Sequence, residues 1–566
     1  MGPPAGYACS HVEHRPEVGN VTEVAPTGEL LALAMRRART GPIFTLNGGH
    51  LWGLYLGARR YDLPMVDVRH EQTAGFAAEG WARITRSCGV AALTAGPGVT
   101  NAISAVAAAH QNDSPVLFLG GRAPSARWGM GSLQELDHLP LVSSITKSAR
   151  TVSSAAEAYP ALLEAVGTAL SGRTGPTFLD IPVDVFLAGA EVPEEGPPPE
   201  GPARGLPEPD PEQVRLVAGM LRRARRPAIA AGSTVWWAHA EEELVRLAET
   251  AAVPVVLNGM ARGMLPPTHP LFASRARGVA LGQADLVLVV GTPLDFRLNF
   301  GQPPLFAEGA QVAYVDVDDF RKHRPGPALL GDLKAALARL AELAAPPESP
   351  SERDAWVERV AAEASAARAA DAELAATGSS PVHPARLVAE VERAVDPDAI
   401  LIGDGGDVVS FAGRLIHRRR PGLWIDGGAF GCLGSGLGHA LAARLAHPDR
   451  QVVVIAGDGA FGFSAMEFDT LVRHRLPVVC VIGNNGIWGL EKHPMQRLLG
   501  TSLLADLAPR TRYDRVVEGL GGHGELVERP EEIGPALERA FRSGLPACVN
   551  VICDPEVEYP RSSPLV

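Results

Sequence analysis

Two groups of residues have the types and spacing to do chemistry, and they lie far apart in the chain. The upstream group is Glu71, within the run Arg69-His70-Glu71-Gln72. The downstream group is Gly457-Asp458-Gly459, followed after 24 residues by Asn484-Asn485. A glutamate can hold or transfer a proton. One carboxylate, one amide oxygen and nearby carbonyls suit a hard divalent cation that also holds a diphosphate.

Buried strands are expected to position the downstream group. Val452 to Ala456 and Val478 to Ile482 are apolar runs typical of parallel strands buried on both faces, and a helix-like stretch, Ser464 to His474, lies between them. In open α/β sheets ligands bind at the carboxyl ends of strands, so Asp458 and Asn485 should lie together. The plainer alternative is two ordinary strand-end turns, which Gly, Asp and Asn favour.

The upstream group has a similar setting. Met65 to Val68 is predicted to be a strand, and Glu71 opens a helix of small residues that runs from Gln72 to Gly80. The alternative interpretation of Glu71 is a first-turn glutamate that the helix dipole favours. The downstream group makes a catalytic role the better explanation.

In this order the two groups resemble the two cofactor-binding halves of thiamine diphosphate enzymes. In that family the glutamate at the position of Glu71 hydrogen-bonds the aminopyrimidine ring, which leads to loss of the thiazolium C2 proton. The resemblance implies a bound Mg²⁺ with Asp458, Asn485 and Ile487 as ligands. The other cofactor-binding residues that it implies are Pro97 and Asn101 in the Thr94–Asn101 loop, Asp407, Gly431, Leu433, Gly457, Gly459 and Ala460. Leu433 stands where the family usually has Met, and Asp407 lies where it often has Gln and His.

Several segments resemble one branch of that family, which contains acetolactate synthase, oxalyl-CoA decarboxylase and 2-hydroxyacyl-CoA lyase. Asp458 to Glu467 is similar to the CoA-utilising members, and Gly486 to Pro494 lacks the Gln-Trp-Gln stretch usual in acetolactate synthases. The closest resemblance is to an actinobacterial subgroup that includes 2-hydroxyisobutyryl-CoA lyases. It implies cleavage of a 2-hydroxyacyl-CoA into formyl-CoA and a ketone or aldehyde, such as acetone. Three alternatives stay open: an acetolactate synthase that condenses pyruvate, a generic nucleotide-binding module, and a catalytically silent regulatory relative.

Substrate-side residues follow from the same resemblance. Glu491 is the candidate acid or base beside the cofactor, Gln134 is expected to face the substrate, and His50 could polarise a substrate oxygen. The candidates for binding a CoA thioester are Arg277, Arg561 and Ser562. The plainer alternatives are a surface glutamate paired with Lys492, a histidine that starts a helix, a solvated arginine and a frayed terminus.

The alternation of apolar strands with helical segments predicts an α/β fold with three doubly wound domains. The expected boundaries are a flexible tail at 1–24, a pyrimidine-binding domain at 25–190, a linker at 191–210, a Rossmann-like middle domain at 211–345, a linker with a helix at 346–380, a diphosphate-binding domain at 381–555 and a C-terminal lid at 556–566. The family resemblance implies that the first and last domains share a fold.

Composition excludes some classes of protein. The net charge of −12 argues against a general nucleic-acid binder, and we find no apolar stretch long enough to span a membrane. Six scattered cysteines without CxxC spacing favour reduced thiols in the cytoplasm. Because the family binds its cofactor between subunits, the resemblance also implies a homo-oligomer, with a dimer as the minimum and a tetramer as the common form.

Overall fold

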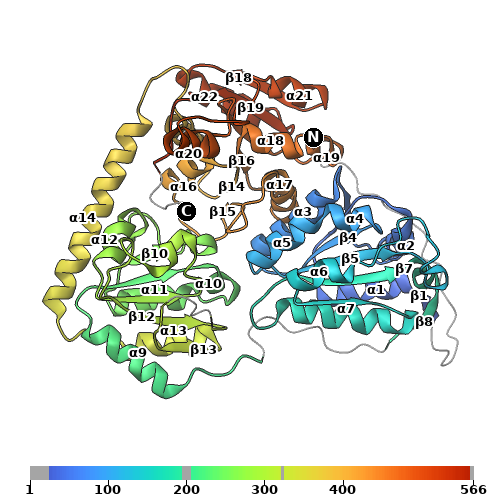
Figure 1. The fold of residues 1–566 in the computed structure, drawn as a ribbon, viewed down its shortest axis with the longest axis horizontal. Helices are drawn as coiled ribbons and strands as arrows, with labels where there is room; N and C mark the ends of the chain where they lie inside the picture. The colour runs from blue at the N-terminus through green and yellow to red at the C-terminus, as the bar shows by residue number, and fades with distance from the viewer. Residues whose placement is uncertain (1–23, 194–204, 320–323, 561–566) are drawn as a thin grey trace.

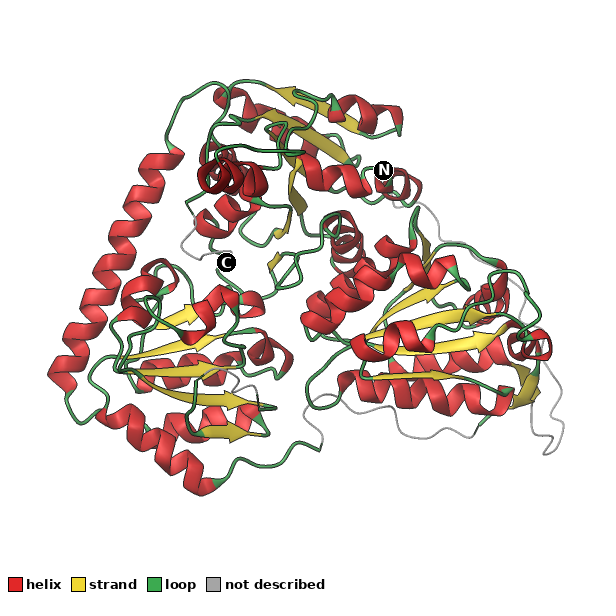
Figure 2. Cartoon of the chain, viewed as in Figure 1, coloured by secondary structure: helices red, strands yellow, loops and turns green. Residues whose placement is uncertain are grey.

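The chain folds into three α/β domains, each built around one parallel sheet (Figures 1 and 2). This computed structural model describes residues 24–193, 205–319 and 324–560. The predicted tail at 1–24 and the middle of the predicted linker at 191–210 lie almost wholly outside the described residues, as do Arg561 and Ser562. The three α/β domains with parallel sheets confirm the fold class expected from the sequence.

The first domain has six parallel strands in the order β3-β2-β4-β5-β7-β6. Their bounds are β2 Ile43–Thr45, β3 Met65–Asp67, β4 Gly89–Leu93, β5 Val116–Arg122, β6 Ser148–Thr151 and β7 Thr177–Pro182. Its helices are α1 Thr27–Ala38, α2 Trp52–Arg60, α3 Glu71–Thr85, α4 Pro97–Asn101, α5 Ile103–Gln111, α6 Leu139–Val142, α7 Ala155–Leu170 and α8 Val183–Leu187. A short antiparallel pair, β1 Val24–Pro26 with β8 Gly189–Glu191, brings the two ends of the domain together.

The middle domain has five parallel strands in the order β10-β9-β11-β12-β13. Their bounds are β9 Pro227–Ala231, β10 Val255–Leu257, β11 Leu286–Val290, β12 Gln311–Asp316 and β13 Ala328–Leu330. The helices are α9 Pro211–Arg223, α10 Ser233–Trp237, α11 Glu241–Thr250, α12 Arg277–Gly282 and α13 Leu333–Leu343. A long helix, α14 Pro350–Ala375, then runs along the outside of the molecule to the last domain (Figure 1).

The last domain has six parallel strands in the order β15-β14-β16-β17-β19-β18. Their bounds are β14 Ile400–Asp404, β15 Trp424–Ile425, β16 Val452–Gly457, β17 Val479–Asn484, β18 His523–Val527 and β19 Ala547–Ile552. The helices are α15 Pro384–Ala394, α16 Asp407–Leu415, α17 Gly436–Ala446, α18 Asp458–Ser464, α19 Glu467–Arg473, α20 Gly489–Leu499, α21 Tyr513–Gly519 and α22 Ile533–Arg542.

The first and last sheets have the same topology, as the sequence suggested. When the strands of each sheet are counted in chain order, both run 2-1-3-4-6-5. The strand order reverses between β2 and β4 in the first sheet and between β14 and β16 in the last. A crevice at such a reversal is where doubly wound sheets bind ligands. Both reversals have candidate site residues at their carboxyl ends.

One predicted element differs from the structure. The helix expected from Ser464 to His474 is two helices, α18 and α19, and the first begins at Asp458 directly after β16. Gly459 and Gly462 lower the intrinsic helix propensity of this segment, which hid the helix in the sequence. Tertiary packing overrides that propensity, since Phe461 is fully buried in the core.

The first and last domains pack closely through α3 and α17. A Cβ on Gly80 would lie 2.8 Å from the Cα of His439, so only glycine permits this approach of the two helices. The buried Glu79 accepts a hydrogen bond from Asn112 Nδ2 (2.7 Å) and lies 3.3 Å from His439 Nε2. No helix in the described parts of the chain combines the length and apolar character that a membrane span requires.

Candidate functional site

The downstream residues converge where the last sheet reverses its strand order. Asp407 begins α16 and Asp458 begins α18, while Asn485 directly follows β17. Asn485 Nδ2 donates a hydrogen bond to Asp407 Oδ2 (2.8 Å), and the Gly486 N–H donates to Asp458 Oδ2 (2.9 Å). The structure therefore brings Asp458 and Asn485 together, as the strand-end spacing predicted, and places Asp407 beside them, as the family resemblance implied.

Two buried carboxyls share this place. Burial raises the pKa of Asp458 to about 6, and the nearby Asp407 carboxylate adds to the rise against hydrogen bonds from the Gly486 and Gly459 N–H groups. Burial also raises the pKa of Asp407. Two negative charges at such short range disfavour ionisation of both carboxyls, and a bound cation would offset the repulsion between them.

The donor set fits a hard cation with a diphosphate. A Cβ placed on Gly457 or on Gly431 would meet no other atom within 4 Å, so open space lies in front of both glycines. No group of three or more His, Cys, Asp or Glu side chains that could hold a metal exists in residues 24–193, 205–319 and 324–560. A cation at Asp458 would therefore need the Asn485 amide oxygen, a main-chain carbonyl such as that of Ile487, and oxygens from a phosphate.

The Asp404 carboxylate holds the glycine-rich segment Gly431 to Gly436 in place. Asp404, at the end of β14, accepts hydrogen bonds from the N–H groups of Gly434 (3.0 Å) and Gly436 (2.8 Å). Asp404 was not among the site residues predicted from the sequence. Its position at the end of an apolar strand was the available signal. Its contacts fix the segment that carries Gly431 and Leu433.

Glu71 begins α3 and is 6% exposed. Its Oε2 accepts a hydrogen bond from Asn101 Nδ2 (3.0 Å) at the end of α4. Pro97 is the first residue of α4, and Gly96 before it has a left-handed φ of +59°. The loop after β4 therefore joins the candidate residues Pro97, Asn101 and Glu71.

The same loop contacts the two other candidates of the first domain. His50 Nδ1 lies 3.2 Å from Thr94 Oγ1, and a Cβ on Gly96 would lie 2.8 Å from the carbonyl oxygen of Gln134. Gln134 has a φ of +58°, which is strained for a residue with a side chain and is typical of functional loops. Burial and the nearby His138 lower the pKa of His50, so its ring is neutral at pH 7.

Glu491 lies in the first turn of α20 and is exposed. The alternative interpretation, a surface glutamate paired with Lys492, holds for the surface position but not for the pairing, since Lys492 Nζ lies 2.6 Å from Asp506 Oδ1. The neighbouring Leu490 covers Gly406, where an added Cβ would lie 2.9 Å from Leu490 Cδ1. Glu491 thus sits on a turn that closes over the glycines beside Asp407.

A cavity of about 690 Å³ extends from these glycines into the interface with the middle domain. Its floor includes Gly405, Gly406, Gly431, Cys432 and Leu490. Its lining also includes a group of basic residues, the basic wall, formed by Arg262, Arg275, Arg277, Arg297, Arg414, His417 and Arg418, and it includes Tyr559. Of these, sequence analysis named only Arg277. The others come from four separate parts of the chain, at Arg262, Arg275, Arg297 and Arg414 to Arg418, and nothing in the sequence indicates that they converge.

Most of these arginines are already paired. Arg275 and Arg414 share Asp371 of α14, with N–O distances of 2.6 and 2.7 Å. Arg297 pairs with Asp295 at 2.6 Å. The remaining partners are the carbonyls of Gly413 and Ile416 for Arg262, and Glu392 with three further carbonyls for Arg418.

Arg277 differs from the paired arginines. Its Nε is buried and has no hydrogen-bond partner among the described residues; Arg418 Nε is also unpartnered, but the other two nitrogens of Arg418 are bonded. Burial lowers its pKa, and the nearby charges of Arg262 and Arg297 lower it further. An anionic group in the cavity would satisfy this N–H and offset the repulsion among the three guanidinium groups.

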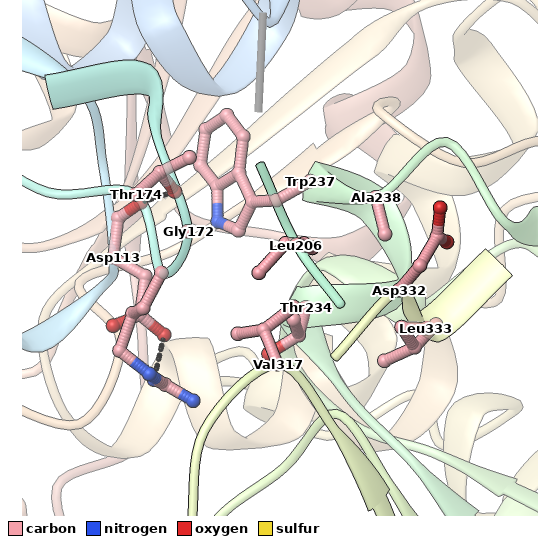
Figure 3. A pocket seen from close by; sticks show the side chains of 11 residues that line it. Asp113, Gly172, Thr174, Leu206, Thr234, Trp237, Ala238, Val317, Asp332 and Leu333 are labelled. Atoms are coloured by element: carbon pink, nitrogen blue, oxygen red, sulfur yellow. Dashed lines mark hydrogen bonds and ion pairs between the residues drawn. The ribbon is translucent and has the colours of Figure 1, made fainter. Parts of the chain in front are cut away.

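A second, much smaller cavity lies between the first and middle domains (Figure 3). It is lined by Asp113, Gly172, Arg173, Thr174, Leu206, Thr234, Trp237, Ala238, Val317, Asp332 and Leu333. Its most prominent polar contact is the ion pair between Arg173 and Asp113 at 2.5 Å. None of the candidate catalytic residues lines it, so we assign it to the domain interface.

Comparison with known proteins agrees with this geometry. The chain matches models described as the thiamine pyrophosphate enzyme N-terminal TPP binding domain (residues 26–141), central domain (214–340) and C-terminal TPP binding domain (404–551). It is 51% identical to "Acetolactate synthase large subunit IlvG" of Mycobacterium tuberculosis, over 96% of this chain and 100% of that protein. It is 35% identical to "2-hydroxyacyl-CoA lyase 2" of Homo sapiens, over 93% of this chain and 89% of that protein. It is 32% identical to "2-hydroxyacyl-CoA lyase" of Oryza sativa subsp. japonica, over 95% and 96%.

Proposed function

Since the chain belongs to the thiamine pyrophosphate enzyme family, we propose that it forms or cleaves a carbon–carbon bond next to a substrate carbonyl, with acetolactate synthesis from pyruvate as the first candidate reaction. The observation that carries this choice is the 51% identity to an acetolactate synthase subunit over the whole of that protein. The sequence motifs favoured a 2-hydroxyacyl-CoA lyase, but lyase relatives share only about a third of their residues with this chain. The comparisons therefore support the synthase alternative better.

The lyase is the second candidate, and the basic cavity supports it. Pyruvate is a small anion that does not need a cavity of about 690 Å³ walled by arginines. A CoA thioester would place its phosphates against Arg277 and its acyl group near the glycine floor. In a synthase, the same wall would hold the phosphates of a bound nucleotide. Arg561 and Ser562, also proposed to contact CoA, lie outside the described residues.

Three residues would hold the Mg²⁺: Asp458, Asn485 and Ile487. Four would lie near the diphosphate of thiamine diphosphate: Asp407, Gly457, Gly459 and Ala460. Gly431 and Leu433 would lie beside the rings of the cofactor. When bound, this cofactor supplies a carbon nucleophile and an electron sink. Glu71 would hold a proton at the aminopyrimidine nitrogen. Neutral His50 and Gln134 would hydrogen-bond the substrate oxygen, while Glu491 moves a proton beside the reacting carbon.

A second copy of the chain is part of this proposal. Glu71, Asn101, His50 and Gln134 do not line the cavity that contains Gly431 and Leu490. They instead gather around the loop after β4 of the first domain, where Pro97 and Asn101 are exposed. We propose that this group faces the last domain of a partner copy, so a homodimer is the minimum and a tetramer is compatible.

The five described cysteines are free, which supports the cytoplasmic location that we propose.

A paired assay tests the proposed function. The purified protein with thiamine diphosphate and Mg²⁺ receives pyruvate in one reaction and 2-hydroxyisobutyryl-CoA in another. Acetolactate from the first without cleavage in the second would support the synthase. Formyl-CoA and acetone from the second alone would replace it with the lyase. Absence of carbon–carbon chemistry in both would contradict either assignment.

A further inference from the structure

The turn that carries Glu71 is held by the last domain of the same chain. Helix α19 of that domain lies against the connection between β3 and α3. Both carboxylate oxygens of Glu467 lie 3.1 Å from the backbone N of Arg69, which donates to them. Thr470 Oγ1 donates to Glu467 Oε2 at 2.7 Å and fixes the carboxylate from its other side.

Glu467 is much more deeply buried than the ion pairs around it. Asp67 pairs with Arg473 at 2.7 Å and with His474 at 3.0 Å, and these groups are substantially exposed. Exposed pairs of this kind contribute little, because water and salt screen them. Glu467 is 3% exposed, and its buried carboxylate accepts a charge-assisted hydrogen bond from the Arg69 backbone N–H. We therefore expect loss of the Glu467 contact, and not loss of the exposed ion pairs, to shift the backbone at this interface.

The position of Glu467 connects two parts of the site. It follows Asp458 along the chain, on the next helix. Its acceptor position at the start of α3 also places negative charge at a helix N-terminus, where the dipole favours it. One continuous segment therefore carries the candidate metal ligand at one end and the anchor of the Glu71 turn at the other.

We propose that Glu467 is a positioning residue: its carboxylate fixes the backbone just ahead of Glu71 and thereby sets where the Glu71 carboxylate meets the cofactor ring. The inference rests on the proposed role of Glu71. A hydrogen bond from a carboxylate to a ring nitrogen requires the two atoms to lie within about 3 Å, and a displacement of about 1 Å costs roughly 100-fold in rate. Releasing the Arg69 N–H would permit such a displacement without removing Glu71.

The test measures exchange of the cofactor C2 proton with deuterium in the holoenzyme, a readout that needs no substrate. The variants are E71Q, E467L and the double variant E71Q/E467L; leucine is used because a glutamine oxygen could still accept from the Arg69 N–H. D67N is the matched control, since it alters exposed contacts of the same interface and keeps the Arg69–Glu467 bond. We expect E71Q to slow exchange by about 100-fold or more and E467L by about 10- to 100-fold. The double variant should equal E71Q, and D67N should stay within about twofold of the wild type.

Thr470→Val gives a milder version in case E467L folds poorly. It removes the hydroxyl donor to Glu467 and nearly keeps the volume, so exchange should slow by a few-fold. Deuterium uptake by the backbone around Arg69 should rise in both E467L and T470V.

Four results would overturn the inference. Exchange in E467L that matches D67N would remove the positioning role. Independent, multiplying losses in the double variant would mean that Glu467 acts on the fold and not through Glu71. Normal exchange in T470V, with normal protection around Arg69, would count against the anchor in the same way. If E71Q itself exchanged at the wild-type rate, the proposed role of Glu71 would fail, and the positioning role with it.

Discussion

The interface between the first and middle domains should respond to pH through Asp316. This carboxyl is 5% exposed and ends β12, and Arg173 of the first domain lies 3.5 Å from it. Burial raises its pKa to about 7, with Asp113 and Asp318 adding to the rise and Arg173 opposing it. Lys147 also faces this cluster, and burial lowers its pKa to about 8. The folded protein therefore takes up a proton here at a higher pH than the unfolded chain does.

The direction and size of the change in stability with pH follow from the difference in the Asp316 pKa between the folded and the unfolded chain. A group with a raised pKa contributes stability that is complete below its unfolded value near 4 and is lost as the pH rises through about 7. Each pKa unit corresponds to about 1.4 kcal/mol, so the range from pH 8 to pH 5 gives about 2 to 3 kcal/mol from this group. In a domain of this size that is a rise in unfolding temperature of about 5–10 °C.

Thermal unfolding of D316N measures this contribution, because an asparagine does not titrate. The rise in unfolding temperature between pH 8 and pH 5 should be smaller in D316N than in the wild type by about 5–10 °C. D318N is the control: its side chain is 57% exposed in the same cluster, and because Asp318 only adds to the raised pKa of Asp316, its pH response should stay closer to the wild type than that of D316N. An equal rise in D316N and the wild type would refute the assignment of the raised pKa to Asp316.

The other predictions concern the site itself. Glu491→Gln should keep cofactor binding and lose about 10²- to 10⁴-fold in turnover, measured by steady-state kinetics beside a cofactor titration; unchanged turnover would remove Glu491 from the mechanism. Arg277→Gln should raise the KM for a CoA ester by about 10- to 100-fold through loss of a charge-assisted bond, whereas Arg420→Gln, which alters an exposed pair with Asp398, should leave it unchanged. A normal KM in R277Q would mean that the basic wall does not bind the CoA substrate. Asp458→Asn should weaken Mg²⁺-dependent cofactor binding by at least tenfold, and an unchanged quench of protein fluorescence on titration would contradict the cation site.

The strands at the centre of the fold could be predicted because parallel strands buried on both faces are continuous apolar runs. Val452 to Ala456 and Leu286 to Val290 show this, and both form strands. The meeting of Asp458 with Asn485 was also predictable, since residues at the carboxyl ends of neighbouring parallel strands share one edge of the sheet. Glu71 begins its helix as expected.

Contacts between remote segments could not be predicted. Arg262, Arg297 and Arg414 meet at one wall only because the middle and last domains pack together. The bond between Glu467 and the Arg69 N–H likewise joins residues separated by most of the chain. Local patterns record neither of these contacts, because they depend on the packing of separate domains.

The choice between a synthase and a lyase could not be made from the motifs either. Both candidate reactions use the same cofactor residues, so those residues do not separate them. The segment Gly486 to Pro494 led us to the lyase, and identity over the whole chain supports the synthase better.

Complementation between two inactive variants tests the central claim most directly, which is that Glu71 of one copy and Asp458 of another complete one active site. E71Q and D458N are each expected to be inactive alone. In a mixed dimer, one site combines the intact Glu71 of the D458N chain with the intact Asp458 of the E71Q chain. Coexpression should therefore restore activity to about a quarter of the wild-type level, since about half of the dimers are mixed and each has one intact site of two. No activity in an isolated mixed dimer would contradict the shared site and place both residues in one chain.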